Sequence, residues 1–471
     1  MTHTEAKELL KRHDQGHVLQ FWEQLDAVQR DGLLNQVAGL DWETLARIRT
    51  ILKKKAVEGA ATVCAGIEPA PVVSQSANEQ AAPRSEGEKA LRSGKVGVIL
   101  VAGGQGTRLG YDGPKGTFRL APLSRASLFE IHARKILAME RRCGAPIPFY
   151  IMTSEGNDAE TRSFFAEHRF FGLDQKRVKF FTQGTLPAFW PDGRIVLESP
   201  GKLFAAPDGH GGILTALDRR GMLADMKMHG VTTLFYFQVD NPMVEIADPV
   251  FVGLHLQRGA EMSLKVCAKR DPAEGLGVVV VRDGRQAVVE YTELTDEQKR
   301  ATRANGDLLF RFGSVAIHLF SLEFLQREAA AGLPLHQAYK KVGFCDEAGK
   351  PVKPTKANAY KFEKFIFDAL PDARTSVILE FSREDEFAPV KNADGEDSPE
   401  TAQVAMMEKF ARWMSFCGVA VPRDEKGRLV YRLEIDPLYA NSAEELIKRL
   451  PPGFSINGDV QLGKNTESVS V

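Results

Sequence analysis

Two cations and a run of glycines stand close together near residue 100. The segment GGQG (residues 103–106) is followed by Arg108 and, seven residues later, by Lys115. Glycine lets a backbone come close to a ligand, and exposed backbone N–H groups can bind phosphate. Two cations at this separation can hold a triphosphate between them. The pattern therefore predicts a site for a nucleotide, in which both cations contact phosphate oxygens.

The two commonest nucleotide-binding motifs do not fit this loop. The dinucleotide pattern G-x-G-x-x-G, begun at Gly104, needs glycine or alanine at the position of Leu109. The P-loop pattern needs glycine before its lysine and serine or threonine after it, whereas Lys115 lies between Pro114 and Gly116. A dehydrogenase or a P-loop kinase is therefore disfavoured.

The elements around the loop alternate between strand and helix. An apolar, β-branched run at 96–101 predicts a buried strand that leads into the glycines. Helices are expected at 128–139 and 160–168, and strands at 149–153 and 178–181. This order predicts an α/β fold with a doubly wound, mostly parallel central sheet. Ligands of such sheets bind at the carboxyl ends of the strands, where the glycine loop falls.

Two further polar residues follow predicted strands. Asp240 ends the apolar run at 231–239, and magnesium prefers one or two carboxylates together with phosphate oxygens. Gln183 follows the strand at 178–181 and offers both a donor and an acceptor, which suits an imide edge such as that of uracil. A capping aspartate and a polar turn are the structural alternatives for these two residues.

The sequence around these residues resembles a known enzyme group. GGQGTRLG followed by PKG is similar to the signature of nucleotide-sugar pyrophosphorylases, most of all the eukaryotic-type UDP-sugar pyrophosphorylase family. FTQGTLPA, QVDN, VVEY and REDEFAPVKN extend the resemblance from about residue 95 to about 400. It implies a Rossmann-like, nucleotide-diphospho-sugar transferase fold. It also implies Mg²⁺-assisted uridylyl transfer from UTP to a sugar 1-phosphate, without a covalent intermediate, giving a UDP-sugar and pyrophosphate.

The resemblance also implies a role for each matching residue. The catalytic cations are Arg108, Lys115 and Lys391, and the metal ligand is Asp240. The uridine contacts are Gly103, Gly104, Gln183 and Gly209. The sugar contacts are His210, Gly211, Glu290, Ser314, Phe365 and Phe367.

The identity of the sugar stays open at this point. His210 and Ser314 stand where the acetylated-sugar enzymes have asparagine, which favours glucose 1-phosphate or another unacetylated hexose 1-phosphate. Phe365 and Phe367 match aromatic residues around an N-acetyl methyl group, which favours N-acetylglucosamine 1-phosphate, the substrate we expect. A third alternative is a regulator that binds a UDP-sugar without catalysis. The presence of every cation of the motif and of Asp240 argues against it.

Composition limits the other possibilities. The 471 residues carry a net charge of -1, so no overall field favours nucleic acid or membrane. Five cysteines are scattered without a C-x-x-C pair, and no apolar run approaches the length of a membrane span. We therefore expect a cytoplasmic enzyme that is a monomer or a weak homo-oligomer.

Three consecutive domains are predicted along the chain. Residues 1–90 form helices and a flexible linker, the linker being the Ala-, Pro-, Ser- and Glu-rich stretch 60–88. Residues 91–400 form the catalytic nucleotidyltransferase domain, and residues 401–471 a small, β-rich C-terminal domain.

Overall fold

The computed structural model describes residues 1–58, 66–76 and 78–463, and it divides into two compact units. Unit 1 comprises Met1–Val63, Gln183–Ile213 and Gly332–Asp368. Unit 2 comprises Cys64–Thr182, Leu214–Ala331 and Ala369–Val471. This division cuts across the predicted domain boundaries, because two later stretches of the chain belong to the same unit as the N-terminal helices.

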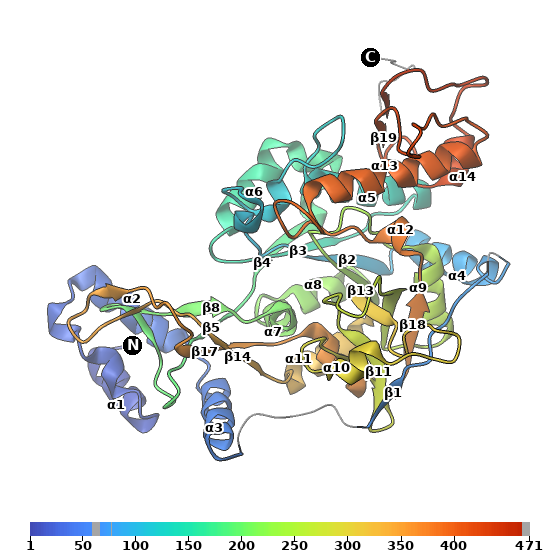
Figure 1. The fold of residues 1–471 in the computed structure, drawn as a ribbon. Helices are drawn as coiled ribbons and strands as arrows, with labels where there is room; N and C mark the ends of the chain where they lie inside the picture. Colours follow the sequence, from blue (N-terminus) through green and yellow to red (C-terminus); the bar gives the residue numbers. More distant parts are fainter. Residues whose placement is uncertain (59–65, 77, 464–471) are drawn as a thin grey trace. The chain divides into compact units, whose positions relative to one another are not determined.

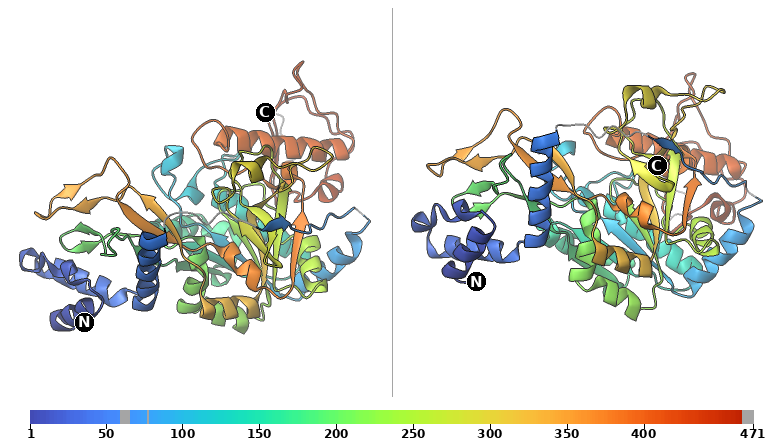
Figure 2. Two further views of the ribbon diagram at one scale, coloured as in Figure 1. Left: turned by 60° about the horizontal axis from the view of Figure 1, so that its bottom comes forward. Right: turned by 90° about the horizontal axis from the view of Figure 1, so that it is seen from below.

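Unit 1 combines N-terminal helices with short antiparallel strand pairs (Figures 1 and 2). Apolar residues at helical spacing, such as Leu10, Leu33 and Ile48, pack in one core with Phe189 and Phe362. The predicted helical appendage is therefore part of a larger core. Its helices are α1 (His3–Arg12), α2 (Ala27–Gly39) and α3 (Trp42–Glu58). Its strand pairs are β5 (Thr185–Pro187) with β8 (Ala205–Pro207), β6 (Leu197–Ser199) with β7 (Lys202–Leu203), β14 (His336–Lys340) with β17 (Ala359–Glu363), and β15 (Phe344–Cys345) with β16 (Pro351–Val352).

Unit 2 is built on a 10-stranded sheet with the order β1-β11-β13-β9-β2-β3-β4, to which β10, β12 and β18 are added. The strands are β1 (Ile67–Pro69), β2 (Val96–Val101), β3 (Phe149–Thr153), β4 (Val178–Thr182), β9 (Thr233–Gln238), β10 (Met262–Ala268), β11 (Val278–Arg282), β12 (Arg285–Val289), β13 (Phe312–Ser321) and β18 (Ser376–Glu380). The four strands β9-β2-β3-β4 are parallel, and β13 pairs antiparallel with β9, β10 and β11. The sheet is therefore mixed, and the expected mostly parallel sheet is wrong for the half beyond β9.

Helices cover both faces of the parallel half. Phe149 and Ile151 of β3 share a core with α5 (Leu128–Cys143) on one face. Tyr150 points the other way, and its hydroxyl donates to Asp225 of α8 (Met222–Met228) at 2.9 Å. Alternate residues of one buried strand thus contact helices on opposite sides, which explains its continuous apolar sequence. The other helices of unit 2 include α6 (Asp158–Glu167), α7 (Ile213–Arg219), α10 (Asp296–Arg300), α11 (Leu322–Ala331) and α12 (Arg383–Glu386).

The strand order reverses between β2 and β9. The chain runs from β2 to β3 and β4 on one side, and β9 then pairs with β2 on the other side. Val101 and Gln238, the last residues of β2 and β9, lie directly opposite each other. A reversal of this kind leaves a crevice outside the carboxyl ends of the two strands, where α/β proteins bind ligands.

Part of the predicted flexible linker is helical. Residues 60–65 of that stretch lie outside the described residues, but α4 (Ala81–Arg92) is a regular helix that packs on α9 (Pro249–Gln257). A Cβ at Gly87 would lie 1.9 Å from the Pro249 carbonyl oxygen, and one at Gly253 would lie 1.7 Å from the Pro83 carbonyl oxygen. Two glycines let these helices approach closely, a tertiary contact that composition does not reveal.

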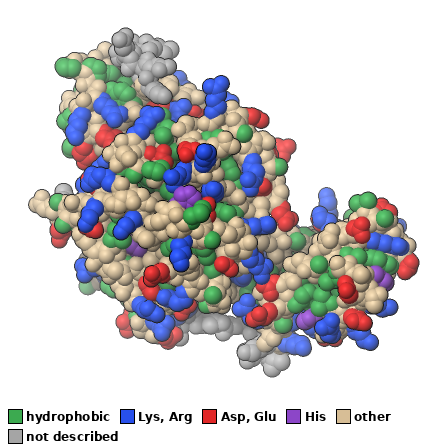
Figure 3. All heavy atoms as spheres, turned by 180° about the vertical axis from the view of Figure 1, so that it is seen from behind, with side chains coloured by type: hydrophobic (Ala, Val, Ile, Leu, Met, Phe, Trp, Pro, Cys, Tyr) green, Lys and Arg blue, Asp and Glu red, His purple; other side chains and the backbone are tan. Residues whose placement is uncertain are grey.

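The C-terminal part of unit 2 has its own apolar cluster. It includes α13 (Pro399–Phe416), β19 (Leu433–Ile435), α14 (Ala443–Ile447) and β20 (Val460–Leu462), and β19 and β20 pair in parallel. Cations and anions are interspersed on the face drawn in Figure 3, in keeping with the near-zero net charge. Within the described residues, no helix has the length and apolarity needed to span a bilayer.

Two histidines buried in unit 2 predict a loss of stability in acid. Burial lowers the pKa of His132 to about 3 and that of His255 to about 4. Between pH 6.5 and pH 4 the unfolded chain therefore binds protons that the folded chain does not, so stability falls as the pH falls. From pH 7.5 to 5.5 each histidine is expected to cost about 1.4 kcal/mol of unfolding free energy.

Urea unfolding at both pH values measures this loss. His255→Gln removes one titrating group while keeping a side chain that can hydrogen-bond to Ser263, which lies 2.8 Å from His255 Nδ1. The unfolding free energy of the variant should differ less between pH 7.5 and pH 5.5 than that of the wild-type chain. An unchanged difference would remove His255 from the explanation.

Candidate active site

The glycine loop begins where β2 ends. Lys115 N–H donates to the Gly104 carbonyl at 3.0 Å, and Asn157 Nδ2 donates to the Ala102 carbonyl at 2.9 Å. Gly104 itself is exposed, and a Cβ there would meet no atom within 4 Å. Packing does not require glycine at this position, and the backbone here is open to the close approach of a ligand. Gly103 is half-buried beside it.

Asp240 lies beside this loop. Val239 N–H donates to the Val101 carbonyl at 3.1 Å, which places the end of β9 next to the end of β2. Lys115 Nζ lies 3.7 Å from Asp240 Oδ2, and both side chains are largely buried. The structure thus brings together two residues that the sequence separates by 125 positions and that were assigned to metal and phosphate.

Lys391 joins Asp240 through the backbone. Val390 N–H donates to the Asp240 carbonyl at 2.8 Å, so the segment that carries Lys391 is fixed at the end of β9. Lys391 Nζ lies 3.8 Å from Asp397 Oδ2, and its side chain is 39% exposed. Asp397 also pairs with Arg270 at 3.2 Å. The Asp397 carboxylate therefore keeps a cationic partner if Lys391 moves away.

Arg108 lies on a short 3-10 turn, η3 (Thr107–Leu109), that follows the glycines. Its side chain is exposed, and no hydrogen bond or ion pair links it to any residue that the structure describes. A guanidinium without a protein partner at the edge of the glycine loop is free to contact an anion such as a phosphate.

Glu290 and Ser314, two of the predicted sugar contacts, lie on either side of Gly277. Ser314 N–H donates to the Gly277 carbonyl at 2.8 Å, and a Cβ at Gly277 would lie 3.3 Å from Glu290 Oε1. The pairing of β10 with β13 shifts register at this place, and Ala316 has φ +58°. Bulges and positive φ values at non-glycine residues are common next to active sites, where they redirect side chains.

The other predicted contacts gather in unit 1. Gln183 is buried, and Asp208 N–H donates to the carbonyl of the adjacent Gly184 at 3.1 Å. The loop at Gly209 and Gly211 packs on the backbone around Lys364, where a Cβ at Gly209 would lie 2.5 Å from the Lys364 carbonyl oxygen. Gly209 also has φ +83°. The fold therefore requires these glycines, and they give no separate evidence for a ligand.

His210 is the centre of an aromatic cluster that follows this loop in η7 (His210–Gly212). Its ring stacks on Phe365 with centroids 5.4 Å apart and lies 5.6 Å from Phe367. Burial, with a smaller contribution from His336, lowers the pKa of His210 to about 4. Its Nδ1 accepts from the Ile366 N–H at 3.2 Å, so the neutral ring carries its proton on Nε2.

Two residues that contact this cluster, His336 and Asp368, were not predicted from the sequence. His336 contacts Phe365 with ring centroids 4.4 Å apart, and its Nε2 lies 2.7 Å from Asp368 Oδ2. Phe365 is thus in ring contact with two histidines, His210 and His336. Because the pair is 32 residues apart in the chain, no local spacing could have found it.

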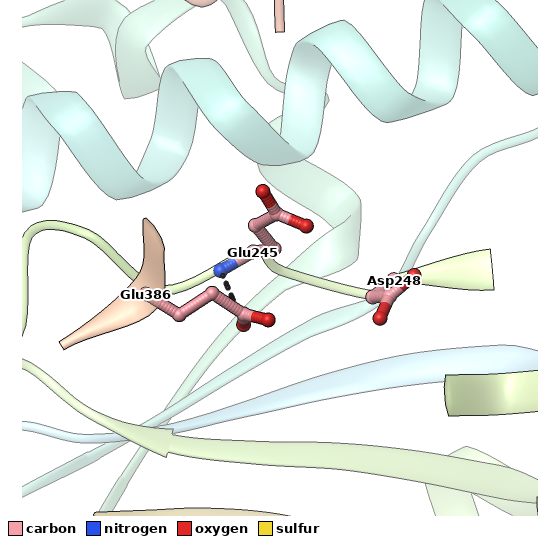
Figure 4. A group of neighbouring side chains, drawn as sticks. All are labelled: Glu245, Asp248 and Glu386. Atoms are coloured by element: carbon pink, nitrogen blue, oxygen red, sulfur yellow. Dashed lines mark hydrogen bonds between the residues drawn. The ribbon is translucent and has the colours of Figure 1, made fainter. Parts of the chain in front are cut away.

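A second group of acids, which could hold a metal by its spacing, lies in unit 2. Among the described residues, Glu245, Asp248 and Glu386 have carboxylate oxygens within 4.8 Å of one another (Figure 4). The ammonium of Lys265 contacts two of them, Asp248 at 2.8 Å and Glu386, and so occupies the place of a cation. This group does not fit a divalent metal, whereas the single carboxylate of Asp240 fits magnesium if substrate phosphates complete the ligands.

The chain is similar to several known proteins along most of its length. A human protein named UDP-N-acetylhexosamine pyrophosphorylase-like protein 1 is 38% identical over 96% of this chain and 92% of its own length. The UDP-N-acetylglucosamine pyrophosphorylase of Saccharomyces cerevisiae is 37% identical over 71% of this chain and 73% of its own length. The solved uridine diphosphate N-acetylglucosamine pyrophosphorylase of Trypanosoma brucei, in complex with an inhibitor, matches with a TM-score of 0.82 and 28% identity, covering 99% of each chain.

The family match covers more than half of the sequence. Residues 51–396 match the family described as UTP–glucose-1-phosphate uridylyltransferase. The matched range contains the glycine loop, Asp240 and Lys391. The resemblance inferred from GGQGTRLG and PKG is confirmed, and the chain belongs to the UTP–glucose-1-phosphate uridylyltransferase family.

Proposed function

We propose that this protein is a uridylyltransferase that makes UDP-N-acetylglucosamine and pyrophosphate from UTP and N-acetylglucosamine 1-phosphate. One observation carries the proposal: Asp240 and Lys115 meet at 3.7 Å where β2 and β9 end side by side. The family supports uridylyl transfer from UTP to a sugar 1-phosphate. The names of the relatives at 35–38% identity, which contain N-acetylhexosamine or N-acetylglucosamine, support the choice of sugar.

In the proposed reaction the protein mainly positions the two substrates and neutralises their charge. The sugar phosphate is already an anion near neutral pH, so its oxygen attacks the α-phosphorus of UTP without a general base, and pyrophosphate leaves. Arg108 and Lys115 hold the leaving pyrophosphate, and Lys391 holds the phosphates from the opposite side. Holding two polyanions together and cancelling their repulsion is the main catalytic work.

Asp240 is the residue that would hold magnesium. When bound, the ion supplies charge neutralisation to the phosphate oxygens. Lys115, 3.7 Å away, keeps the Asp240 carboxylate oriented toward the glycine loop. The parallel half of the sheet, with helices on both faces, is the Rossmann-like nucleotide-binding part in this proposal.

The state of His210 explains why it can replace asparagine. An asparagine side chain offers an N–H donor, and a neutral imidazole whose Nδ1 accepts from Ile366 offers Nε2–H in the same way. The low pKa of His210 keeps the ring neutral at physiological pH. Phe365 and Phe367 supply apolar surface beside it, which suits the methyl group of an N-acetyl substituent.

Pyrophosphate release tests the function. The purified chain is incubated with UTP, Mg²⁺ and one of four 1-phosphates: those of glucose, galactose, N-acetylglucosamine and N-acetylgalactosamine. We expect release with N-acetylglucosamine 1-phosphate at a kcat/KM at least tenfold above that with glucose 1-phosphate. A preference for glucose 1-phosphate would overturn the choice of sugar. No release with any sugar phosphate would overturn the enzyme and leave a UDP-sugar binder.

Substitutions at His210 test the sugar site separately. His210→Asn keeps an N–H donor and should retain activity with N-acetylglucosamine 1-phosphate within threefold. His210→Leu removes the donor, and we expect the KM for that sugar phosphate to rise about tenfold, the value of one hydrogen bond. His168→Leu, at an exposed histidine of unit 2, is the control and should leave KM unchanged. Equal KM values for His210→Leu and the wild type would exclude His210 from sugar binding.

A further inference from the structure

A buried ion pair lies in unit 2 and has no part in the chemistry above. Lys265 of β10 is 1% exposed, and its ammonium contacts the carboxylates of Asp248 at 2.8 Å and of Glu386. Burying charges is costly, and a buried pair is often no more stabilising than apolar side chains of the same size. A role in orienting the chain is therefore a better reason for this pair than stability.

Glu386 connects Lys265 to a second segment. Its carboxylate also accepts from the Glu245 N–H at 3.3 Å (Figure 4). Its backbone carbonyl accepts from Asn241 Nδ2 at 2.6 Å. Glu386 is 4% exposed, so solvent does not compete for these contacts. The side chain is fixed to the sheet through Lys265, while the backbone of the same residue contacts the residue that follows Asp240.

Asn241 completes the connection. Its Oδ1 accepts from the N–H groups of Met243 and Ala388, each at 3.2 Å, and its side chain is buried. Two residues beyond Ala388, the Val390 N–H donates to the Asp240 carbonyl at 2.8 Å. Three hydrogen bonds therefore join the turn at 240–241 to the segment 386–390, one from each of Asn241 Nδ2, Ala388 N and Val390 N.

We propose that Asn241, Glu386 and Lys265 are positioning residues that hold the backbone of Asp240 and the segment of Lys391 in fixed register. The inference rests on the proposed function, in which Asp240 and Lys391 act on the same phosphates. Asp240 and Lys391 lie on loops. A displacement of about 1 Å in a reacting group can lower the rate a hundredfold. Hydrogen bonds are directional, so a buried network of them can define how the turn at 240–241 lies against the segment 386–390. Apolar contacts lack this directionality.

Four variants test the network. Asn241→Ala removes the amide N–H donor and the amide oxygen acceptor. Glu386→Leu removes the carboxylate that Lys265 contacts. Glu386→Gln keeps the shape of the side chain and one of the two oxygens that accept hydrogen bonds from Lys265 and from the Glu245 N–H. Glu261→Leu is the matched control, because Glu261 precedes the same strand β10 and is held by Arg327 through two bonds of 2.7 and 2.8 Å.

Two readouts separate positioning from stability. In Asn241→Ala and Glu386→Leu we expect kcat to fall roughly tenfold to a hundredfold with KM values within threefold. Hydrogen exchange at residues 386–391 should become faster in the same two variants. Glu386→Gln should recover part of the loss in kcat and part of the change in hydrogen exchange. Glu261→Leu should change neither quantity when it is measured at a temperature below its unfolding midpoint.

The outcomes decide between the possibilities. Unchanged exchange at 386–391 in Asn241→Ala, or the same changes in Glu261→Leu, would overturn the proposal. If Glu386→Leu does not fold, Asn241→Ala, which leaves every buried charge paired, still gives both readouts. If the wild-type chain releases no pyrophosphate, the proposed function fails. The exchange data then still decide whether the three residues hold the two loops together.

Discussion

Asp240→Asn is expected to lower kcat by roughly a hundredfold or more, while the KM for UTP stays the same or falls. The substitution keeps the shape of the side chain and removes its charge. A neutral amide is a poor magnesium ligand, so the transition state loses charge neutralisation that is normally worth at least this factor. UTP binding does not suffer in the same way, because Lys115, 3.7 Å from the carboxylate, is released from its counter-ion and becomes freer to bind phosphate.

Steady-state kinetics over a range of Mg²⁺ concentrations measure the effect. Half-maximal activity should require more Mg²⁺ in the variant than in the wild type. Asp225→Asn is a matched control, since Asp225 also pairs with a lysine of unit 2, Lys179, at 3.4 Å but lies on α8. A kcat for Asp240→Asn within threefold of the wild type would exclude the carboxylate from the reaction.

Arg108→Ala is expected to lower kcat by about a hundredfold, the scale of losing one charged donor to a developing anion. Arg108 has no partner among the described residues, so its removal leaves no buried charge and should not change stability. In the reverse reaction the KM for pyrophosphate should rise as well, because the guanidinium is proposed to hold the leaving group. Arg108→Lys keeps the charge without the two-pronged geometry and should recover part of the rate.

The control for this prediction is another exposed arginine of unit 2. Arg141→Ala on α5 removes the same charge from the protein without touching the glycine loop. The kinetic constants of Arg141→Ala should stay within twofold of the wild-type values in the forward and in the reverse reaction. An equal loss in Arg141→Ala would point to a general effect of net charge, and full activity of Arg108→Ala would remove Arg108 from the mechanism.

Local sequence predicted the elements that carry the chemistry. The apolar runs before the glycine loop and before Asp240 are strands β2 and β9, because a run of this length with β-branched residues can only be buried between two layers. Alternation of strand and helix predicted β3 and β4, and the strands β9-β2-β3-β4 are parallel as expected. The confirmed family explains why the loop and Asp240 occur together.

Other parts of the fold depend on contacts that a local pattern does not contain. An apolar strand has the same composition in a parallel and in an antiparallel sheet. The sequences of β10, β11 and β13 therefore did not indicate that the sheet is mixed. The stretch 60–88 has the composition of a linker, yet its last part lies in helix α4 (Ala81–Arg92). In the structure this helix packs closely on Pro249, a residue far along the chain, at Gly87. The glycines at 209 and 211 suggested a ligand, yet the backbone around Lys364 already requires them.

The sequence by itself determined which residue types are present at the strand ends. The glycine loop with its two cations is one motif of a few positions, and QVDN with its aspartate is another. Only the tertiary structure decided how they are held. Asp240 meets Lys115 because β2 and β9 are neighbours, and Asn241 and Glu386 meet across 145 positions of chain. His336 reaches Phe365 and Asp368 in the same way. Hydrogen bonds and ring contacts act over a few ångströms in space, and distance along the chain leaves no trace of them in the sequence.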